Sequence, residues 1–124
     1  PLLDIIQQAS QLGFRLIITT DHGTINVKNP SKVIGDKNTS LNLRYKTGRS
    51  LSYEEKDVLS IKNPKDILLP SINMSSSFIF AKGDLFFAYP NNYNHYVSYY
   101  RNTYQHGGVS MEEMIIPYSV LDPK

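Results

Sequence analysis

Apolar positions at the start of the chain recur at helical spacing and then give way to a continuous run. Residues 2–12 place Leu, Ile and Ala three and four positions apart, which predicts an amphipathic helix. Residues 14–18 form a short run rich in branched side chains, and the polar stretch 19–23 follows it. This predicts a buried strand that ends in a loop. A helix, a short turn and a buried strand in that order are typical of α/β domains.

The middle of the chain shows shorter patterns separated by turn residues. Apolar and polar positions alternate over residues 41–45, which predicts a strand, and Ser52 with the acidic residues after it predicts a short helix over 53–59. Two apolar runs, 77–81 and 85–89, flank a Lys-Gly-Asp turn. Together they predict a β-hairpin.

The last third of the chain carries weaker patterns. Residues 93–100 place tyrosines and a valine on one helical face, so this segment is either a helix or an irregular tyrosine-rich stretch. Ser110 and Glu113 have the spacing of a capping box, which predicts a helical turn. Residues 114–116 lead into Pro117 and predict a strand that ends near a sheet edge.

Composition narrows the class of protein. The chain has 124 residues, 40% of them hydrophobic and 19% charged, which fits one globular domain. The net charge of +2 is too small to indicate nucleic acid or membrane as a partner. The absence of cysteine excludes disulfides, thiolate zinc fingers and a cysteine nucleophile, and fits a reducing compartment. No apolar run approaches the roughly 20 residues that span a bilayer.

Two short motifs carry candidate metal ligands. Asp21-His22-Gly23 directly follows the predicted strand, and a carboxylate beside an imidazole suits zinc or manganese. His106-Gly107-Gly108 places two glycines after a histidine, which lets the backbone approach an ion or a phosphate closely. Taken alone, each motif is also compatible with an ordinary surface turn.

Two further segments have candidate binding residues. Basic residues gather over 28–49, and Arg44, Lys46 and Arg49 are candidates to hold substrate phosphates. The alternative is a solvated strand face and loop. The tyrosine-rich segment 89–104, with Arg101, suits stacking on nucleic-acid bases or, alternatively, packing at the rim of a core.

The two motifs in combination resemble a known family. The sequence Thr-Asp-His-Gly at 20–23, followed by His-Gly-Gly-Val-Ser-Met-Glu-Glu-Met-Ile-Ile-Pro at 106–117, is similar to the C-terminal half of a PglZ domain of the alkaline phosphatase superfamily. Residues 86–92 and 105–117 also resemble the PglZ effector domains of PorX-type response regulators of Bacteroidetes. The resemblance implies a partial alkaline-phosphatase-like α/β sheet with flanking helices and a β-hairpin, with residues 1–124 as the C-terminal portion of a larger domain.

The resemblance also implies a chemistry. It matches Asp21 and His22 to one metal ion of a two-zinc phosphoesterase site and His106 to the other. In the family the nucleophile and the remaining ligands precede the Asp-His-Gly motif. Three ligands are too few for two ions, so the chain alone is expected not to turn over substrate. The parent protein is expected to be a cytoplasmic signalling effector that cleaves phosphomonoesters or phosphodiesters.

Two other functions remain open at this stage. The domain could be a non-catalytic interaction or dimerisation module, or a nucleic-acid-binding module that uses the basic stretch 28–49, whose affinity would fall steeply with salt. The chain begins at Pro1 with a helix already under way, so we expect it to be a piece of a longer protein. A sheet divided in this way exposes an edge, from which we expect self-association.

Overall fold

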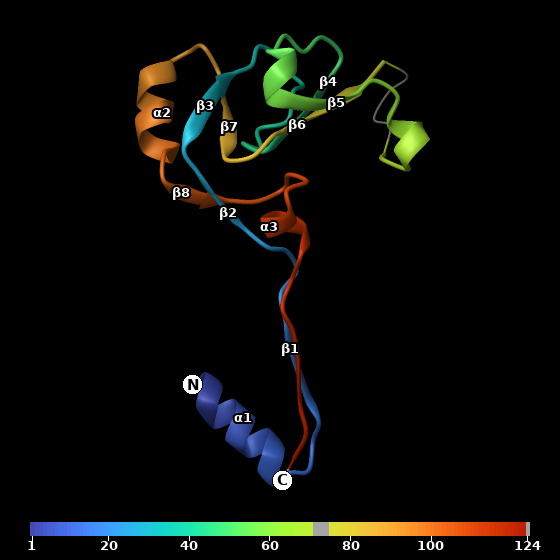
Figure 1. Ribbon diagram of the computed structural model, residues 1–124, viewed down its shortest axis with the longest axis vertical. Coiled ribbons are helices and arrows are strands. Elements are labelled where there is room, and N and C mark those ends of the chain that lie inside the picture. Colours follow the sequence, from blue (N-terminus) through green and yellow to red (C-terminus); the bar gives the residue numbers. More distant parts are fainter. Residues whose placement is uncertain (71–74, 124) are drawn as a thin grey trace.

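The computed structural model describes residues 1–70 and 75–123 and shows a head carried on an extended two-stranded arm (Figure 1). Strand β1 (Leu16–Thr19) runs from the far end of the arm towards the head, and β9 (Tyr118–Leu121) returns antiparallel to it. Helix α1 (Leu2–Gln11) lies at the far end of the arm, where the chain also ends. The first and last elements of the chain therefore form one unit outside the head.

The arm confirms the predicted helix and the place of the first strand, but not the burial of that strand. Gly13, at a φ of +75°, turns the chain after α1. Strand β1 has only β9 beside it among the described residues, and the side chain of Ile17 is 51% exposed. The prediction of a buried strand is thus wrong: side chains alternate between half-buried and exposed along β1.

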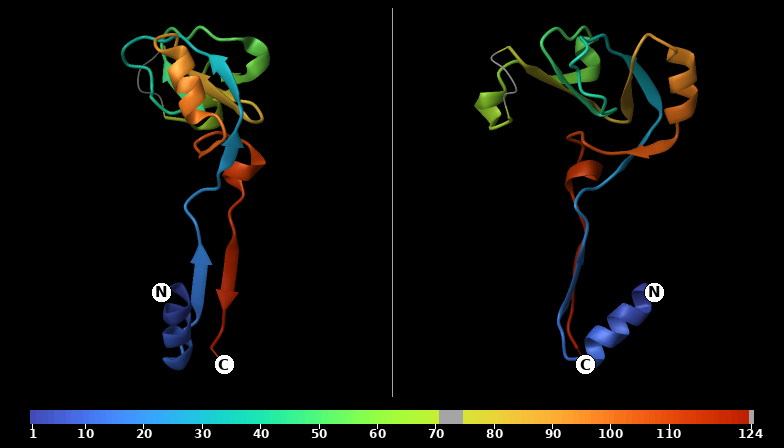
Figure 2. Two further views of the ribbon diagram at one scale, coloured as in Figure 1. Left: turned by 90° about the vertical axis from the view of Figure 1, so that its left-hand side faces the viewer. Right: turned by 180° about the vertical axis from the view of Figure 1, so that it is seen from behind.

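In the part of the chain that the structure describes, the head contains three small sheets (Figure 2). In the first, β2 (Ile25–Val27) pairs antiparallel with β8 (Thr103–Gln105), and in the second, β3 (Asn29–Lys32) pairs parallel with β7 (Leu85–Ala88). The third sheet has β6 (Ser77–Ala81) at its centre, antiparallel to both β4 (Tyr45–Gly48) and β5 (Val58–Ile61). The chain is therefore a mixed α/β structure built from small sheets, as expected from the sequence.

Two further helices belong to the head. Helix α2 (Tyr93–Tyr100) shows that residues 93–100 are helical, and α3 (Met111–Met114) confirms the helical turn predicted from Ser110 and Glu113. The helix predicted over 53–59 is only the 3₁₀ turn Glu55–Asp57, because the chain then continues as β5. A second 3₁₀ turn spans Pro64–Ile67.

The predicted hairpin over 77–89 is wrong in its pairing. Both strands exist and a turn joins them, with the N–H of Leu85 donating to the carbonyl oxygen of Lys82 at 3.1 Å. Both edges of β6 are already occupied by β4 and β5, so β7 pairs with β3 instead. The alternation of the sequence located the strands and could not reveal that competition for the edges of β6.

Two other predicted strands are displaced. Residues 41–44 form a turn, and β4 begins only at Tyr45, because the Asn42 side chain accepts the backbone N–H groups of Arg44 and Tyr45. Near the C-terminus the strand lies after Pro117 and not before it, because the last turn of α3 already contains Met114.

Strand β7 separates two hydrophobic clusters. Successive side chains of a strand point to opposite faces, so Phe86 and Phe87 enter different clusters. Phe87 packs with Val33, Val58, Ile79 and Ala81, and Phe86 packs with Ile25, Val27 and Ala88. Tyr93, Val97 and Tyr100 of α2 cover the Phe86 cluster. Among the described residues, no helix has the length and apolar character needed to cross a bilayer.

Candidate metal centre

The two histidines of the sequence motifs meet where the arm joins the head. His22 follows β1 and His106 follows β8. Their rings stack with centroids 3.8 Å apart and planes inclined by 12°. The structure therefore brings together two motifs that lie far apart in the sequence.

The hydrogen bonds of His22 prepare one ring nitrogen for a ligand. Nδ1 lies 2.9 Å from the carbonyl oxygen of Gly23, and because a carbonyl only accepts, this bond requires the proton on Nδ1. In the neutral ring Nε2 then carries the lone pair, and it lies 3.6 Å from Oδ2 of Asp21. Metal-binding histidines commonly donate their second ring N–H to a backbone carbonyl in this way. The Asp21 carboxylate is 87% exposed, so one side of the pair is open to solvent.

Gly23 holds the first motif against the second. Its N–H donates to the carbonyl oxygen of Glu113 at 2.9 Å. A Cβ at this position would lie 2.0 Å from the carbonyl oxygen of Glu112, closer than any side chain permits. The glycine of Asp-His-Gly is therefore required by the close approach of the chain to α3, and this contact fixes His22 beside His106.

The two positions after His106 require glycine for different reasons. Gly107 adopts a φ of +101°, in the region that favours glycine. A Cβ on Gly108 would lie 2.5 Å from a carboxylate oxygen of Glu113, whose other oxygen accepts the Gly108 N–H at 2.9 Å. The His-Gly-Gly motif thus shapes a loop that wraps around the side chain of Glu113.

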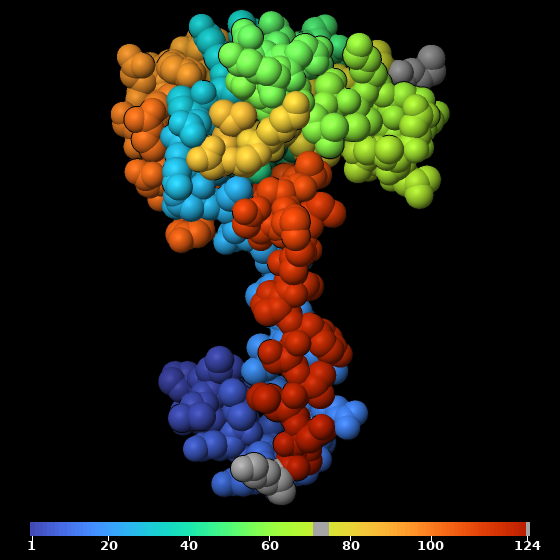
Figure 3. All heavy atoms as spheres, in the orientation of Figure 1, coloured from blue at the N-terminus to red at the C-terminus, as the bar shows by residue number. Residues whose placement is uncertain are grey.

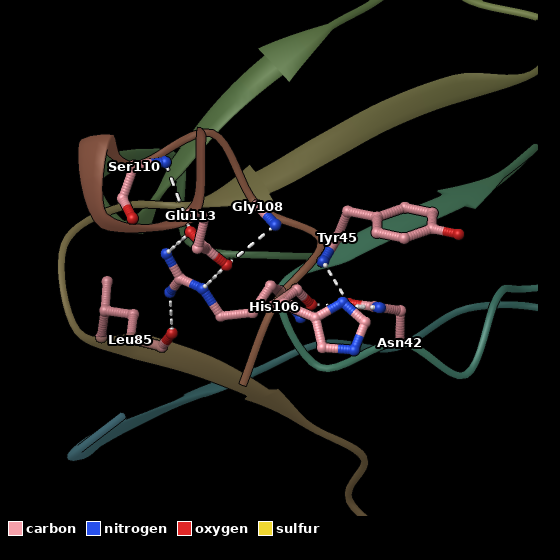
Figure 4. A network of polar contacts seen from close by, with 8 residues as sticks. Asn42, Tyr45, Leu85, His106, Gly108, Ser110 and Glu113 are labelled. Carbon is pink, nitrogen blue, oxygen red and sulfur yellow. Dashed lines mark hydrogen bonds and ion pairs between the residues drawn. The ribbon is translucent and has the colours of Figure 1, made fainter. Parts of the chain in front are cut away.

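Glu113 forms a buried ion pair with Arg44 that closes this loop (Figure 4). The Nε and one terminal nitrogen of Arg44 donate to the two carboxylate oxygens at 2.9 and 2.8 Å, and the other terminal nitrogen donates to the carbonyl oxygen of Leu85. The Ser110 N–H adds a bond to the carboxylate at 3.3 Å. Burial alone would raise the pKa of Glu113, but the bonds from Arg44, Gly108 and Ser110 outweigh it and lower that pKa.

Asn42 links the head to the His106 loop, and sequence reasoning missed it. Its Oδ1 accepts the N–H groups of Arg44 and Tyr45 at 2.7 and 3.1 Å, and its Nδ2 donates to the carbonyl oxygen of His106 at 3.3 Å (Figure 4). An Asn whose side chain accepts from a backbone N–H two residues later is a common turn signal. That signal was present in the sequence, but the contact with His106 depends on the tertiary fold.

The basic residues expected to hold phosphate fall into different environments. Arg44 is 0% exposed and engaged by Glu113, so its expected role as a phosphate ligand is replaced by a structural one. Lys46 is 1% exposed, and burial lowers its pKa to about 8. Arg49 is exposed just after β4. The burial of Arg44 and Lys46 also argues against one continuous basic surface for nucleic acid over 28–49.

The two histidines and Asp21 fit metal ligation in one particular way. Lone pairs lie in the ring plane, so two parallel stacked rings cannot both direct a nitrogen at one ion. They can each direct a nitrogen at a separate ion, as a two-metal site requires. Across residues 1–70 and 75–123, no group of three or more His, Cys, Asp or Glu is arranged to hold a metal ion. Each ion would therefore need ligands beyond this trio.

Comparison with known proteins supports the resemblance of the motifs. The family model described as the BREX system PglZ alkaline phosphatase-like domain matches residues 2–121. The match includes the arm, the head and both histidine motifs. A search of the curated proteins found no match.

Proposed function

The chain belongs to the PglZ alkaline phosphatase-like family, and from this membership we propose that Asp21, His22 and His106 are metal ligands of a zinc-dependent phosphoesterase site. The observation that carries the proposal is the stacking of His22 on His106 with Nε2 of His22 free beside Asp21. In this arrangement Asp21 and His22 serve one zinc ion, and His106 serves the other.

The reaction class follows from such a pair of ions. Two bound metals activate an attacking hydroxyl and stabilise the leaving oxygen of a phosphate ester. This chain's residues would supply the ligands and hold them in place. The backbone N–H of Gly23 holds the Asp-His-Gly motif against α3. The side chains of Asn42 and Glu113 form hydrogen bonds with the backbone of the His106 loop. Arg49, which is exposed just after β4, is our candidate for contact with a substrate phosphate.

The wider setting of the site rests on the sequence resemblance. We propose that the chain is the C-terminal portion of a PglZ-type domain and that the nucleophile and the other ligands come from the part preceding Asp-His-Gly. We further propose a phosphodiesterase or phosphatase that acts as the cytoplasmic effector of a signalling response regulator. The similarity of residues 86–92 and 105–117 to PorX-type effector domains supports that setting.

Zinc titration by calorimetry tests the assignment of the ligands. We expect weak but saturable binding to the chain, reduced at least about tenfold in the Asp21→Ala/His22→Ala/His106→Ala variant because each substitution removes a direct ligand. The matched control is His95→Ala, which removes the third histidine, an exposed residue on α2. Binding that is unchanged in the triple variant, or lost in the His95 control, would contradict the assignment.

A further inference from the structure

A small pocket opens on the head between α2 and the segment that leads into β4. Its volume is about 270 Å³. Ligand pockets for drug-sized molecules begin near 300 Å³, so this one suits a molecule with a single ring. Its walls are mostly apolar and aromatic and include one lysine; they comprise Leu41, Leu43, Lys46, Phe87, Ala88, Tyr89, Tyr96 and Tyr100.

Lys46 is the charged residue among these walls. Its side chain is 1% exposed, Nζ donates to the carbonyl oxygen of Ser40 at 2.9 Å, and the ring of Tyr89 lies 4.5 Å from Nζ. Within the described part of the chain, no ion pair includes Lys46. An ammonium group buried without a counter-charge is costly, and a bound anion would remove that cost.

The walls around Lys46 suit a flat ring. Tyr96 and Tyr100 lie one turn apart on α2, with rings inclined by 16° and centroids 6.2 Å apart. Tyr96 is 40% exposed and Leu41 is 85% exposed. Apolar and aromatic surface beside an enclosed cation is the usual construction of a site for a ligand that has an apolar body and a single charged group.

We propose that this pocket binds a small anion carrying one planar ring, with the charged group on Nζ of Lys46 and the ring against Tyr96 and Leu43. The site uses none of the three proposed metal ligands, so it does not depend on the phosphoesterase function. Along the chain, Asn42, which donates to the carbonyl oxygen of His106, lies between the wall residues Leu41 and Leu43.

Calorimetry with phenylphosphonate at neutral pH in the presence of EDTA tests the proposal. EDTA removes metal, so any binding is independent of His22 and His106. We expect saturable binding of phenylphosphonate, and at least about tenfold weaker binding of benzyl alcohol, which lacks the charge, and of inorganic phosphate, which lacks the ring. These two comparisons separate the contribution of Lys46 from that of the aromatic walls.

Two variants and a control assign the site. Lys46→Met keeps the volume of the side chain, removes the charge and is expected to weaken phenylphosphonate binding at least about tenfold. Tyr96→Leu is expected to weaken it about threefold without touching the charge. Lys62→Met, at an exposed lysine away from the pocket walls, is expected to change nothing.

Several results would overturn the proposal. One is the absence of saturable phenylphosphonate binding to chain whose circular dichroism shows that it is folded. Another is an affinity for benzyl alcohol equal to that for phenylphosphonate, which would mean that the ammonium group of Lys46 does not contribute to binding. A third is affinity that is unchanged in both Lys46→Met and Tyr96→Leu, which would place the anion elsewhere.

Discussion

At the scale of single residues, Glu113 holds the candidate site in shape. Its carboxylate accepts from Arg44, from Gly108 and from Ser110, and so connects the segment before β4, the His106 loop and α3. The sequence indicated Glu113 as part of a capping box with Ser110. In the structure its carboxylate accepts hydrogen bonds from the backbone of the loop that follows His106. A buried arginine partner far away in the sequence could not be read from local pattern.

Replacing Glu113 is therefore expected to be costly. Glu113→Gln leaves the Arg44 guanidinium buried without a counter-charge, and loss of one partner of a buried pair typically costs about 3–5 kcal/mol. Urea unfolding at neutral pH measures the loss. Arg44→Met/Glu113→Gln removes both charges, so we expect it to be more stable than Glu113→Gln alone. A double variant that is less stable than the single one would contradict this account of the pair.

The same pair predicts a dependence of stability on acid pH. Because the pKa of Glu113 is lower in the folded chain than in the unfolded chain, its contribution is complete above the ordinary carboxyl range and is lost as the pH falls through the folded-state value. The stability difference between the wild-type chain and Glu113→Gln should therefore shrink on acidification. A difference that stays constant between neutral pH and pH 3 would exclude this linkage.

Lys46 predicts a second rise of stability with pH, in the alkaline range. Burial lowers its pKa from the ordinary value near 10.5 to about 8, so folding disfavours its charged form. Stability should rise with pH between those two values, since the unfolded chain still binds a proton there and the folded chain does not. The advantage of Lys46→Met over wild type in urea should therefore be largest below pH 8 and smaller at pH 9.5. A stability difference between Lys46→Met and wild type that is equal at both pH values would refute this prediction. The same trend in Lys62→Met would refute it too.

At the scale of elements, the sequence located strands better than it paired them. Helix α1, the strands at 77–81 and 85–88 and the turn of α3 follow from local periodicity and capping. The pairing of β7 with β3 does not, because it depends on β4 and β5 occupying both edges of β6. Strands β2, β3 and β8 are short and lie among turn residues, so their patterns were too brief to stand out.

The contact between the Asp-His-Gly motif and α3 can be tested by a substitution at Gly23. Gly23→Ala places a methyl group against the carbonyl oxygen of Glu112 and is expected to cost about 1–3 kcal/mol, as overpacking does. It should also shift the ring resonances of His22 and His106. Gly83→Ala is the control: it meets no atom within 4 Å and, although a φ of +49° strains it, should leave both rings unchanged. Unaltered histidine resonances in Gly23→Ala would contradict the proposed contact.

At the scale of the whole molecule, the arm is the least covered part of the structure. The space-filling view shows a narrow neck between the head and the lower unit (Figure 3). Apolar side chains along the arm are exposed, including Leu3 at 64%, Phe14 at 63% and Tyr118 at 67%. A two-stranded ribbon is marginally stable by itself in water, and an open apolar edge favours pairing with another strand.

This surface predicts self-association of the chain. Light scattering over a range of concentrations should show dimers or larger species. Ile17→Thr together with Val120→Thr, which makes two exposed positions of the ribbon polar, should shift the population towards monomer. A chain that remains monomeric at high concentration would refute the prediction.

The measurement that tests the metal assignment most directly is a zinc titration followed by the imidazole ¹⁵N resonances. The chain has three histidines, so each signal can be assigned with single variants. Zinc should shift the signals of His22 and His106 together and leave His95 unchanged, with Nε2 as the affected nitrogen of His22 because its Nδ1 is held by the Gly23 carbonyl. Signals of His22 and His106 that do not move, or a shift of His95 of equal size, would contradict the proposed centre.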